Sequence, residues 1–183
     1  MRRLMFVALA AAAFALPAAA QAAVPEPVMT GLDNPRGLAF GPEGGLYVAE
    51  AGRGGSGVCV PLPDGAGMRC YGATGAISRL WRGAHERIAT GLPSLAGQPA
   101  GETAAGPQDV SFQGRGGLYV TIGLGGNPAS LTTGPLSGLG FGYLMHVPAS
   151  GHAKRLVGVA GYEVSANPDD AQVDSNPFGL LAL

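Results

Sequence analysis

Residues 35–49 read PRGLAFGPEGGLYVA and residues 107–121 read PQDVSFQGRGGLYVT, an ungapped match at an offset of 72. A third copy begins at an offset of 142, where four residues of the first copy recur: Asn34, Pro35, Gly37 and Leu38 become Asn176, Pro177, Gly179 and Leu180. A long repeat built from short strands is typical of propellers and solenoids, whose units cannot bury their faces alone. The repeat therefore predicts an all-β protein assembled from similar sheets.

Each repeat contains four stretches with the composition of short strands. In the first copy they lie near Gly37–Phe40, Leu46–Glu50, Ala76–Trp81 and Glu86–Thr90, and the second copy adds Gly142–Val147 and Lys154–Gly158. Tight turns at residues 41–44 and 114–116 separate the first two strands of each copy. Four strands in roughly 70 residues indicate a propeller blade with long loops. We expect one blade at about 30–92, a second at about 106–160 and the start of a third at about 174–183, an incomplete ring.

The first 22 residues predict an export signal. Arg2 and Arg3 precede an apolar run, Leu4–Leu16, and residues 20–22 form an A-x-A cleavage site. A retained N-terminal membrane anchor is the alternative, although the run is short for a bilayer span and no charged stop-transfer flank follows. We expect residues 23–183 to form the mature protein, periplasmic or secreted, with no stable membrane insertion.

The composition fits a β domain and argues against two classes of partner. The chain has 32 glycines and 15 prolines, and charged residues make up only 13%. Removal of Arg2 and Arg3 leaves nine basic residues against twelve acidic ones, a formal charge of −3. Nucleic-acid binding is not expected from such a balance. Lys154 is the only lysine and the arginines are scattered, so a basic membrane-binding patch is not expected either.

Polar residues gather at one predicted edge of the repeat. The start of strand 1, the end of strand 2 and the start of strand 3 share a face of a blade, and strand 1 is innermost, so these side chains would ring the central channel. The candidate ligand-binding residues are Asn34, Arg36, Glu50, Arg53, Asp109, Asp174 and Asn176, with Asp33 and Gln108 beside them. Converging carboxylate and amide oxygens suit a hard cation such as calcium.

A second interpretation of these residues stays open. Asn-Pro and Asp before a strand are ordinary turn residues, whose side chains satisfy nearby backbone amides. Asn34 and Asn176 fit that turn and blade-registration role as well as a ligand role. For Glu50 and Asp109 both interpretations hold equally, since an acidic residue beside an apolar strand needs a partner if it is buried.

The two cysteines, Cys59 and Cys70, lie in one predicted connection between strands 2 and 3. In an exported protein such a pair predicts a disulfide. A metal or redox pair is the alternative, without C-x-x-C spacing or a nearby histidine to support it. The disulfide would stiffen this connection on the expected ligand face.

The corresponding connection of the second copy is glycine-rich, from Gly123 to Gly142. It lacks both the lysine of a P-loop and the strand-loop-helix context of a dinucleotide site, so we expect a rim loop. His85, His146 and His152 have no metal-ligand spacing. No motif proposes a nucleophile.

Five segments carry a resemblance to a known family: residues 30–57, 90–96, 106–112, 118–128 and 174–181. Together they resemble the ScyD/ScyE family of exported proteins, named after genes of cyanobacterial scytonemin biosynthesis and similar to NHL and TolB-like six-bladed propellers. The resemblance implies a fold and carries no known catalytic residues. Family members continue for several more blades, which implies that this chain is an N-terminal fragment; a short protein that closes its ring by oligomerising is the alternative.

Two function classes follow from these observations. The first is a non-catalytic binding or scaffold protein that holds a small molecule or an envelope protein at the channel mouth. The second is an exported enzyme, because six-bladed propellers also host calcium-assisted lactone or ester hydrolysis and quinone-dependent sugar oxidation. A tightly bound cation on the axis would distinguish the second class from the first.

Overall fold

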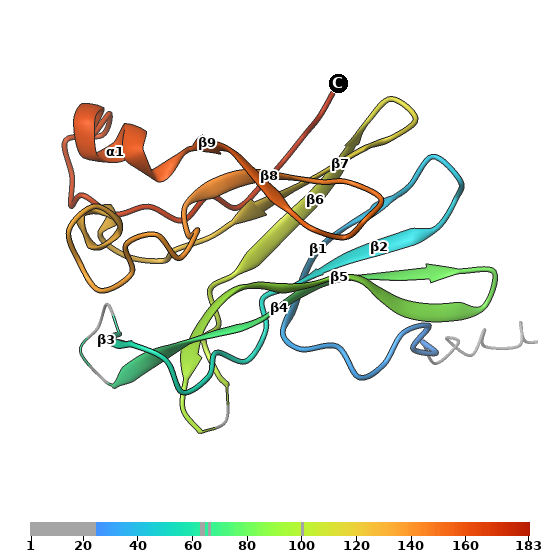
Figure 1. The fold of residues 1–183 in the computed structure, drawn as a ribbon, viewed down its shortest axis with the longest axis horizontal. Coiled ribbons are helices and arrows are strands. Elements are labelled where there is room, and N and C mark those ends of the chain that lie inside the picture. The colour runs from blue at the N-terminus through green and yellow to red at the C-terminus, as the bar shows by residue number, and fades with distance from the viewer. Residues whose placement is uncertain (1–24, 63–64, 66, 100) are drawn as a thin grey trace, which may run out of the picture.

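A computed structural model describes residues 25–62, 65, 67–99 and 101–183 (Figure 1). The predicted signal peptide, residues 1–22, lies outside the described residues. The described chain is all-β in character: it forms two antiparallel sheets, and outside the strands it contains one 3₁₀ turn, η1 (Pro128–Leu131), and one short helix, α1 (Ala160–Ala166). Among these residues no helix is long and apolar enough to cross a membrane.

The first sheet contains the strands predicted for the first copy. Its main path runs through β1 (Pro35–Phe40), β2 (Leu46–Glu50), β4 (Met68–Trp81) and β5 (Ala84–Gly97), all antiparallel. The short strand β3 (Cys59–Pro61) pairs with the beginning of β4. The predicted turn between β1 and β2 is closed by the Gly41 N–H, which donates to the Gly45 carbonyl at 2.8 Å.

Strands β4 and β5 are longer than the sequence predicted. Their pairing continues past the expected ends, from Arg69 opposite Gly97 to Gly72 opposite Ser94, with register shifts between Gly72 and Gly75. Glycine is depleted in strands, so the strand propensity of this glycine-containing segment did not indicate the extension. Gly72 is required by packing, since a Cβ there would lie 2.1 Å from the Gly54 carbonyl oxygen.

The second sheet repeats the arrangement with strands β6 (Pro107–Gln113), β7 (Gly117–Ile122), β8 (Tyr143–Val147) and β9 (Lys154–Gly158) in sequential antiparallel order. The four predicted strands are confirmed, as is the turn at 114–116. The rim loop between β7 and β8 contains η1, and α1 follows β9. Sequence analysis predicted neither helical element.

The two sheets bury their core between them. Strand β6 lies beside β1 and β2 (Figure 1), and the ring of Tyr47 meets the ring of Phe112 edge-on, with centroids 4.7 Å apart. The largest fully buried apolar side chains of this core include Ile77 and Leu95 from the first sheet and Val120, Ile122 and Phe141 from the second sheet and its loop. Because each sheet contributes one face, neither would be covered alone.

The C-terminal segment runs along the second sheet. Leu180 donates its N–H to Asp109 Oδ2 at 2.8 Å, and Ala182 donates to Ser111 Oγ at 3.0 Å. Thr121 Oγ1 donates to the Phe178 carbonyl at 2.9 Å. Residues 178–182 are therefore held against β6 and β7 by side chains of the sheet.

Candidate functional site

Glu50, the last residue of β2, is a fully buried carboxylate that accepts four hydrogen bonds. Oε1 accepts from Ser78 Oγ at 2.5 Å and from Arg87 Nε at 3.0 Å; Oε2 accepts from Arg87 Nη2 at 2.7 Å and from the Asp33 N–H at 2.6 Å. Burial alone raises the pKa of Glu50, but the donors from Arg87, Asp33 and Ser78 outweigh burial and hold the pKa below its ordinary value. Glu50 is thus a charged, saturated acceptor.

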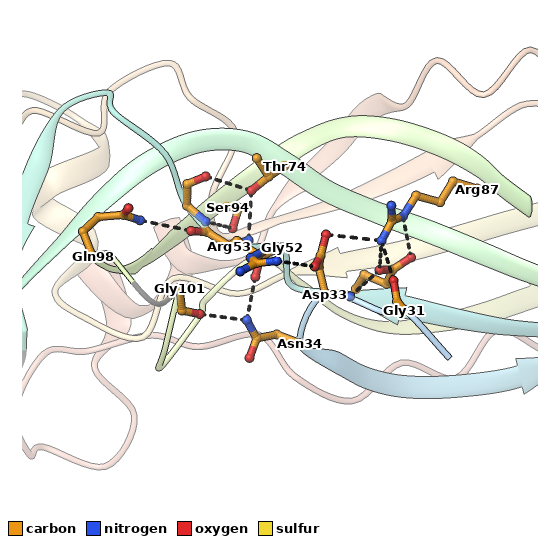
Figure 2. Close-up of polar contacts among 12 residues, drawn as sticks. Gly31, Asp33, Asn34, Gly52, Arg53, Thr74, Arg87, Ser94, Gln98 and Gly101 are labelled. Carbon is orange, nitrogen blue, oxygen red and sulfur yellow. Dashed lines mark hydrogen bonds and ion pairs between the residues drawn. The ribbon is translucent and has the colours of Figure 1, made fainter. Parts of the chain in front are cut away.

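Arg87 connects this carboxylate to the segment before β1. Its Nη2 also donates to the Gly31 carbonyl at 3.1 Å and to Asp33 Oδ2 at 3.2 Å (Figure 2). The hydrogen bond with Glu50 raises the pKa of Arg87. Arg53 lies on the other side of Asp33, with Nη1 3.6 Å from Oδ1. This group of four charged side chains, Asp33, Glu50, Arg53 and Arg87, is the Glu50 cluster.

Asn34 and Arg36 fasten the beginning of β1 to the segment that leads into β6. Asn34 has φ 53°, in the left-handed region that asparagine tolerates, and its Nδ2 donates at 2.8 Å to the carbonyls of both Gly52 and Gly101 (Figure 2). Arg36 Nη2 donates to the Ala104 carbonyl at 2.9 Å. Hydrogen bonds of this kind hold one sheet in a fixed position against the next, as a blade-registration role requires.

Arg53 contributes its backbone to the same junction. Its N–H donates to Thr74 Oγ1 at 2.9 Å, and its carbonyl accepts from Gln98 Nε2 at 3.0 Å (Figure 2). The side chain is 62% exposed. Its guanidinium is therefore the accessible end of the Glu50 cluster.

Asp109 lies on the second sheet, between β1 and the C-terminal segment. Its Oδ1 accepts the N–H of Val110 at 2.9 Å and its Oδ2 accepts that of Leu180. A Cβ built on Gly37 would lie 2.0 Å from Oδ1, so only glycine leaves room for this carboxylate. The partner that a part-buried Asp109 needs is thus supplied by backbone N–H groups.

Asn176 is exposed, and its Oδ1 would be 2.3 Å from a Cβ on Gly123. Gln108 Nε2 lies 2.8 Å from the same point, and within the described chain its Oε1 is buried without a hydrogen-bond partner. Asn176 therefore sits where the loop after β7 meets the beginning of β6.

Asp174 lies in a pocket of about 250 Å³ on the side where β7 ends and β4 begins. Its walls come from the β3–β4 hairpin, the loop after β7 and the segment before Asn176. The lining includes Val60, Arg69, Leu124, Asn127, Leu136 and Asp174. We call it the Arg69 pocket.

Arg69 is the buried cation of that pocket, 6% exposed. Nη2 donates to the Gly125 carbonyl at 3.0 Å and Nη1 to the Leu124 carbonyl at 3.5 Å, while Nε has no partner in the described part of the chain. Burial lowers the pKa of Arg69. No carboxylate lies within 4.0 Å of Arg69 among the residues that the structure describes.

The predicted disulfide is confirmed: Cys59 is bonded to Cys70. The two cysteines are direct cross-strand partners of β3 and β4, and the neighbouring pair is Val60 and Arg69. The crosslink therefore holds a hairpin, where a loop was expected, and fixes the strand that carries Arg69. A disulfide is typical of oxidising compartments.

The predicted residues thus fall into three places. Glu50 and Arg53 meet in the Glu50 cluster with Asn34 and Arg36 beside it, Asp109 and Asn176 belong to the second sheet, and Asp174 lines the Arg69 pocket. Across the described residues, no group of three or more His, Cys, Asp or Glu side chains is close enough to hold a metal ion.

The sequence did not indicate the two arginines that are central to these sites, Arg87 in the Glu50 cluster and Arg69 in the Arg69 pocket. Arg87 stands out in the sequence only because Arg155 occupies the matching position of the second copy. Arg69 stands next to a half-cystine, in a stretch that the strand pattern did not include. The only usable signal was its charge beside a crosslinked residue.

Searches of protein-family models, curated proteins and solved structures gave no match to this chain.

Proposed function

We propose that this chain is an exported, propeller-type protein of the ScyD/ScyE kind that binds a small molecule without transforming it. A five-stranded and a four-stranded antiparallel sheet, with β1 and β6 side by side, support the propeller assignment. The disulfide supports a location outside the cytoplasm. The ligand face is the one on which β1 begins, β2 ends and β4 begins.

The observation that carries this proposal is the Arg69 pocket. It is a hollow on the expected face, with a buried cation, Arg69, whose Nε has no hydrogen-bond partner in the part of the chain that the structure describes. Two of the three carboxylates expected at a cation site are occupied by contrast: Glu50 accepts four hydrogen bonds and Asp109 accepts two. Oxygens that already accept from the chain are poorly placed to bind a cation or to shuttle a proton, which favours binding over catalysis.

The test pairs a binding screen with activity assays on the full chain. Ligand-observed NMR with neutral, cationic and anionic small molecules should find binders. Hydrolysis of phenyl acetate and dihydrocoumarin in the presence of Ca²⁺, and dye-coupled glucose oxidation with pyrroloquinoline quinone, should give no rate above a heat-denatured sample.

Asp109→Asn and Asp170→Asn provide matched variants for the opposite result. Asp170 is exposed and lies away from the Arg69 pocket. Calcium-dependent hydrolysis that Asp109→Asn abolishes and Asp170→Asn preserves would replace the binding proposal with an enzymatic one. A screen in which no small molecule binds would also refute it.

A further inference from the structure

The Arg69 pocket has walls of two kinds. Val60 and Pro61 supply accessible apolar surface, whereas Leu124 and Leu136, which also line the pocket, are almost fully buried. Two opposite charges line the same hollow: Arg69, which is buried, and Asp174, which is exposed. Within the described chain no ion pair joins these two side chains, so the nitrogens of Arg69 and the carboxylate oxygens of Asp174 are more than 4.0 Å apart.

Arg69 has hydrogen-bonding capacity to spare. A guanidinium has five N–H donors in a fixed fork. Within the described residues Arg69 uses one on Gly125 and one, at a long 3.5 Å, on Leu124. Both acceptors are neutral carbonyls. A buried charge without a counter-charge is costly, and a carboxylate is the group whose geometry matches the fork with two parallel hydrogen bonds.

Asp174 restricts which anions suit the pocket. Its carboxylate would repel a dianion such as phosphate, whereas an ammonium group on the ligand would be attracted to it. The pocket volume of about 250 Å³ suits a molecule of amino-acid size. An apolar body would cover the accessible surface of Val60 and Pro61 and displace water from it.

We infer that the Arg69 pocket binds a small zwitterion with an apolar body, of the type of an aliphatic α-amino acid. The carboxylate pairs with Arg69, the ammonium group faces Asp174, and the side chain packs on Val60 and Pro61. The disulfide holds Arg69 in place through the neighbouring cross-strand pair. This assignment rests on the proposed binding function and narrows its ligand class.

Four probes separate the parts of the inference: leucine, 4-methylpentanoate without the ammonium group, isoamylamine without the carboxylate, and inorganic phosphate. We expect calorimetry or ligand-observed NMR on the full chain to show leucine binding more tightly than 4-methylpentanoate. Isoamylamine and phosphate should not bind at about 1 mM, a concentration that detects even weak complexes.

Two variants report on the two charges. Arg69→Met should weaken leucine binding by roughly 10- to 100-fold, as expected for the loss of charge-assisted hydrogen bonds. Asp174→Asn should weaken leucine binding by about two- to fivefold, because the site is exposed. It should not weaken 4-methylpentanoate binding and should tighten it slightly, because a like charge is removed. Asp170→Asn is the control and should alter neither probe.

Arg69→Met removes the hydrogen bonds that Arg69 donates to residues 124 and 125. If this loss disturbs folding, Asp174→Asn still tests the inference. If neither leucine nor 4-methylpentanoate binds, the inferred ligand class is wrong. The proposed binding function still stands in that case if another molecule of the wider screen binds. Equal leucine affinity in the wild type and in Asp174→Asn, or tighter binding of 4-methylpentanoate than of leucine, overturns the zwitterion assignment.

Discussion

Replacing Arg87 with methionine should expose how strongly the Glu50 cluster holds the first sheet together. The change removes two charge-assisted hydrogen bonds to a carboxylate that has no solvent exposure, at 2.7 and 3.0 Å. It also removes the bonds to Asp33 and Gly31. The variant therefore leaves Glu50 buried with only the Ser78 hydroxyl and the Asp33 N–H as donors.

The expected loss is about 2–3 kcal/mol of unfolding free energy at neutral pH. Breaking a buried pair by removing one partner costs roughly 3–5 kcal/mol. Arg87 is 39% exposed, however, so solvent already screens part of the interaction. The two remaining donors to Glu50 reduce the cost further.

Urea unfolding followed by the fluorescence of Trp81, the single tryptophan, measures this loss. Arg115→Met is the matched control, because Arg115 is exposed on the β6–β7 turn and should change stability by less than about 0.5 kcal/mol. In a double-mutant cycle, Glu50→Gln with Arg87→Met should be less destabilised than the sum of the single variants, by about 1–3 kcal/mol. An Arg87→Met variant as stable as Arg115→Met would refute the cluster's role.

The pH dependence supplies a second readout of the same variant. The pKa of Glu50 is lower in the folded protein than its ordinary value. Its contribution to stability is therefore present above the unfolded-state pKa, about 4.3, and is lost as pH falls through the lower folded-state pKa. The gap between wild type and Arg87→Met should narrow below about pH 4; a gap that stays constant there would assign the loss to packing and not to charge.

Two further outcomes are expected. Cys59→Ser with Cys70→Ser should lower the unfolding free energy by roughly 2–3 kcal/mol, as for a loop of about a dozen residues; urea titration showing no loss would mean that the β3–β4 hairpin is held by other contacts. Gly37→Ala should cost about 1–3 kcal/mol, because its Cβ would meet Asp109 Oδ1, whereas Gly116→Ala, which meets nothing within 4 Å, should be nearly neutral in the same titration.

The strands were predictable where the local pattern of apolar residues and glycine turns agrees with the position of the segment in the sheet. Predicted Leu46–Glu50 and Lys154–Gly158 coincide with β2 and β9, because apolar and β-branched residues there are bounded by glycine turns. The prediction failed in the first half of β4. That segment is a strand because it pairs with β3 and with the second half of β5. Its glycine, Gly72, is required by the close approach of residues 54–55, and neither feature leaves a periodic signal in the chain.

The site was predictable only in part, for a similar reason. The sequence indicated that a buried Glu50 would need a partner, but the partner follows 37 residues later. Which side chain of β5 meets β2 depends on the register through β4, and bulges there shift that register. Arg69 was hidden by the same unpredicted stretch of strand.

Hydrogen-bond saturation separates the polar residues of this face into two groups. Glu50 and Asn34 direct their polar atoms at partners inside the chain, and the energy of those bonds is realised on folding. Arg69 is as deeply buried as a core residue, yet it leaves N–H donors unused and has no carboxylate near it in the described chain. A cation in that position would be stabilised by an anion that pairs with it. Glu50 and Asn34, which fit the turn and metal patterns of the sequence, thus stabilise the fold, whereas the proposed binding site combines Asp174, which those patterns also indicated, with an arginine that matched none of them.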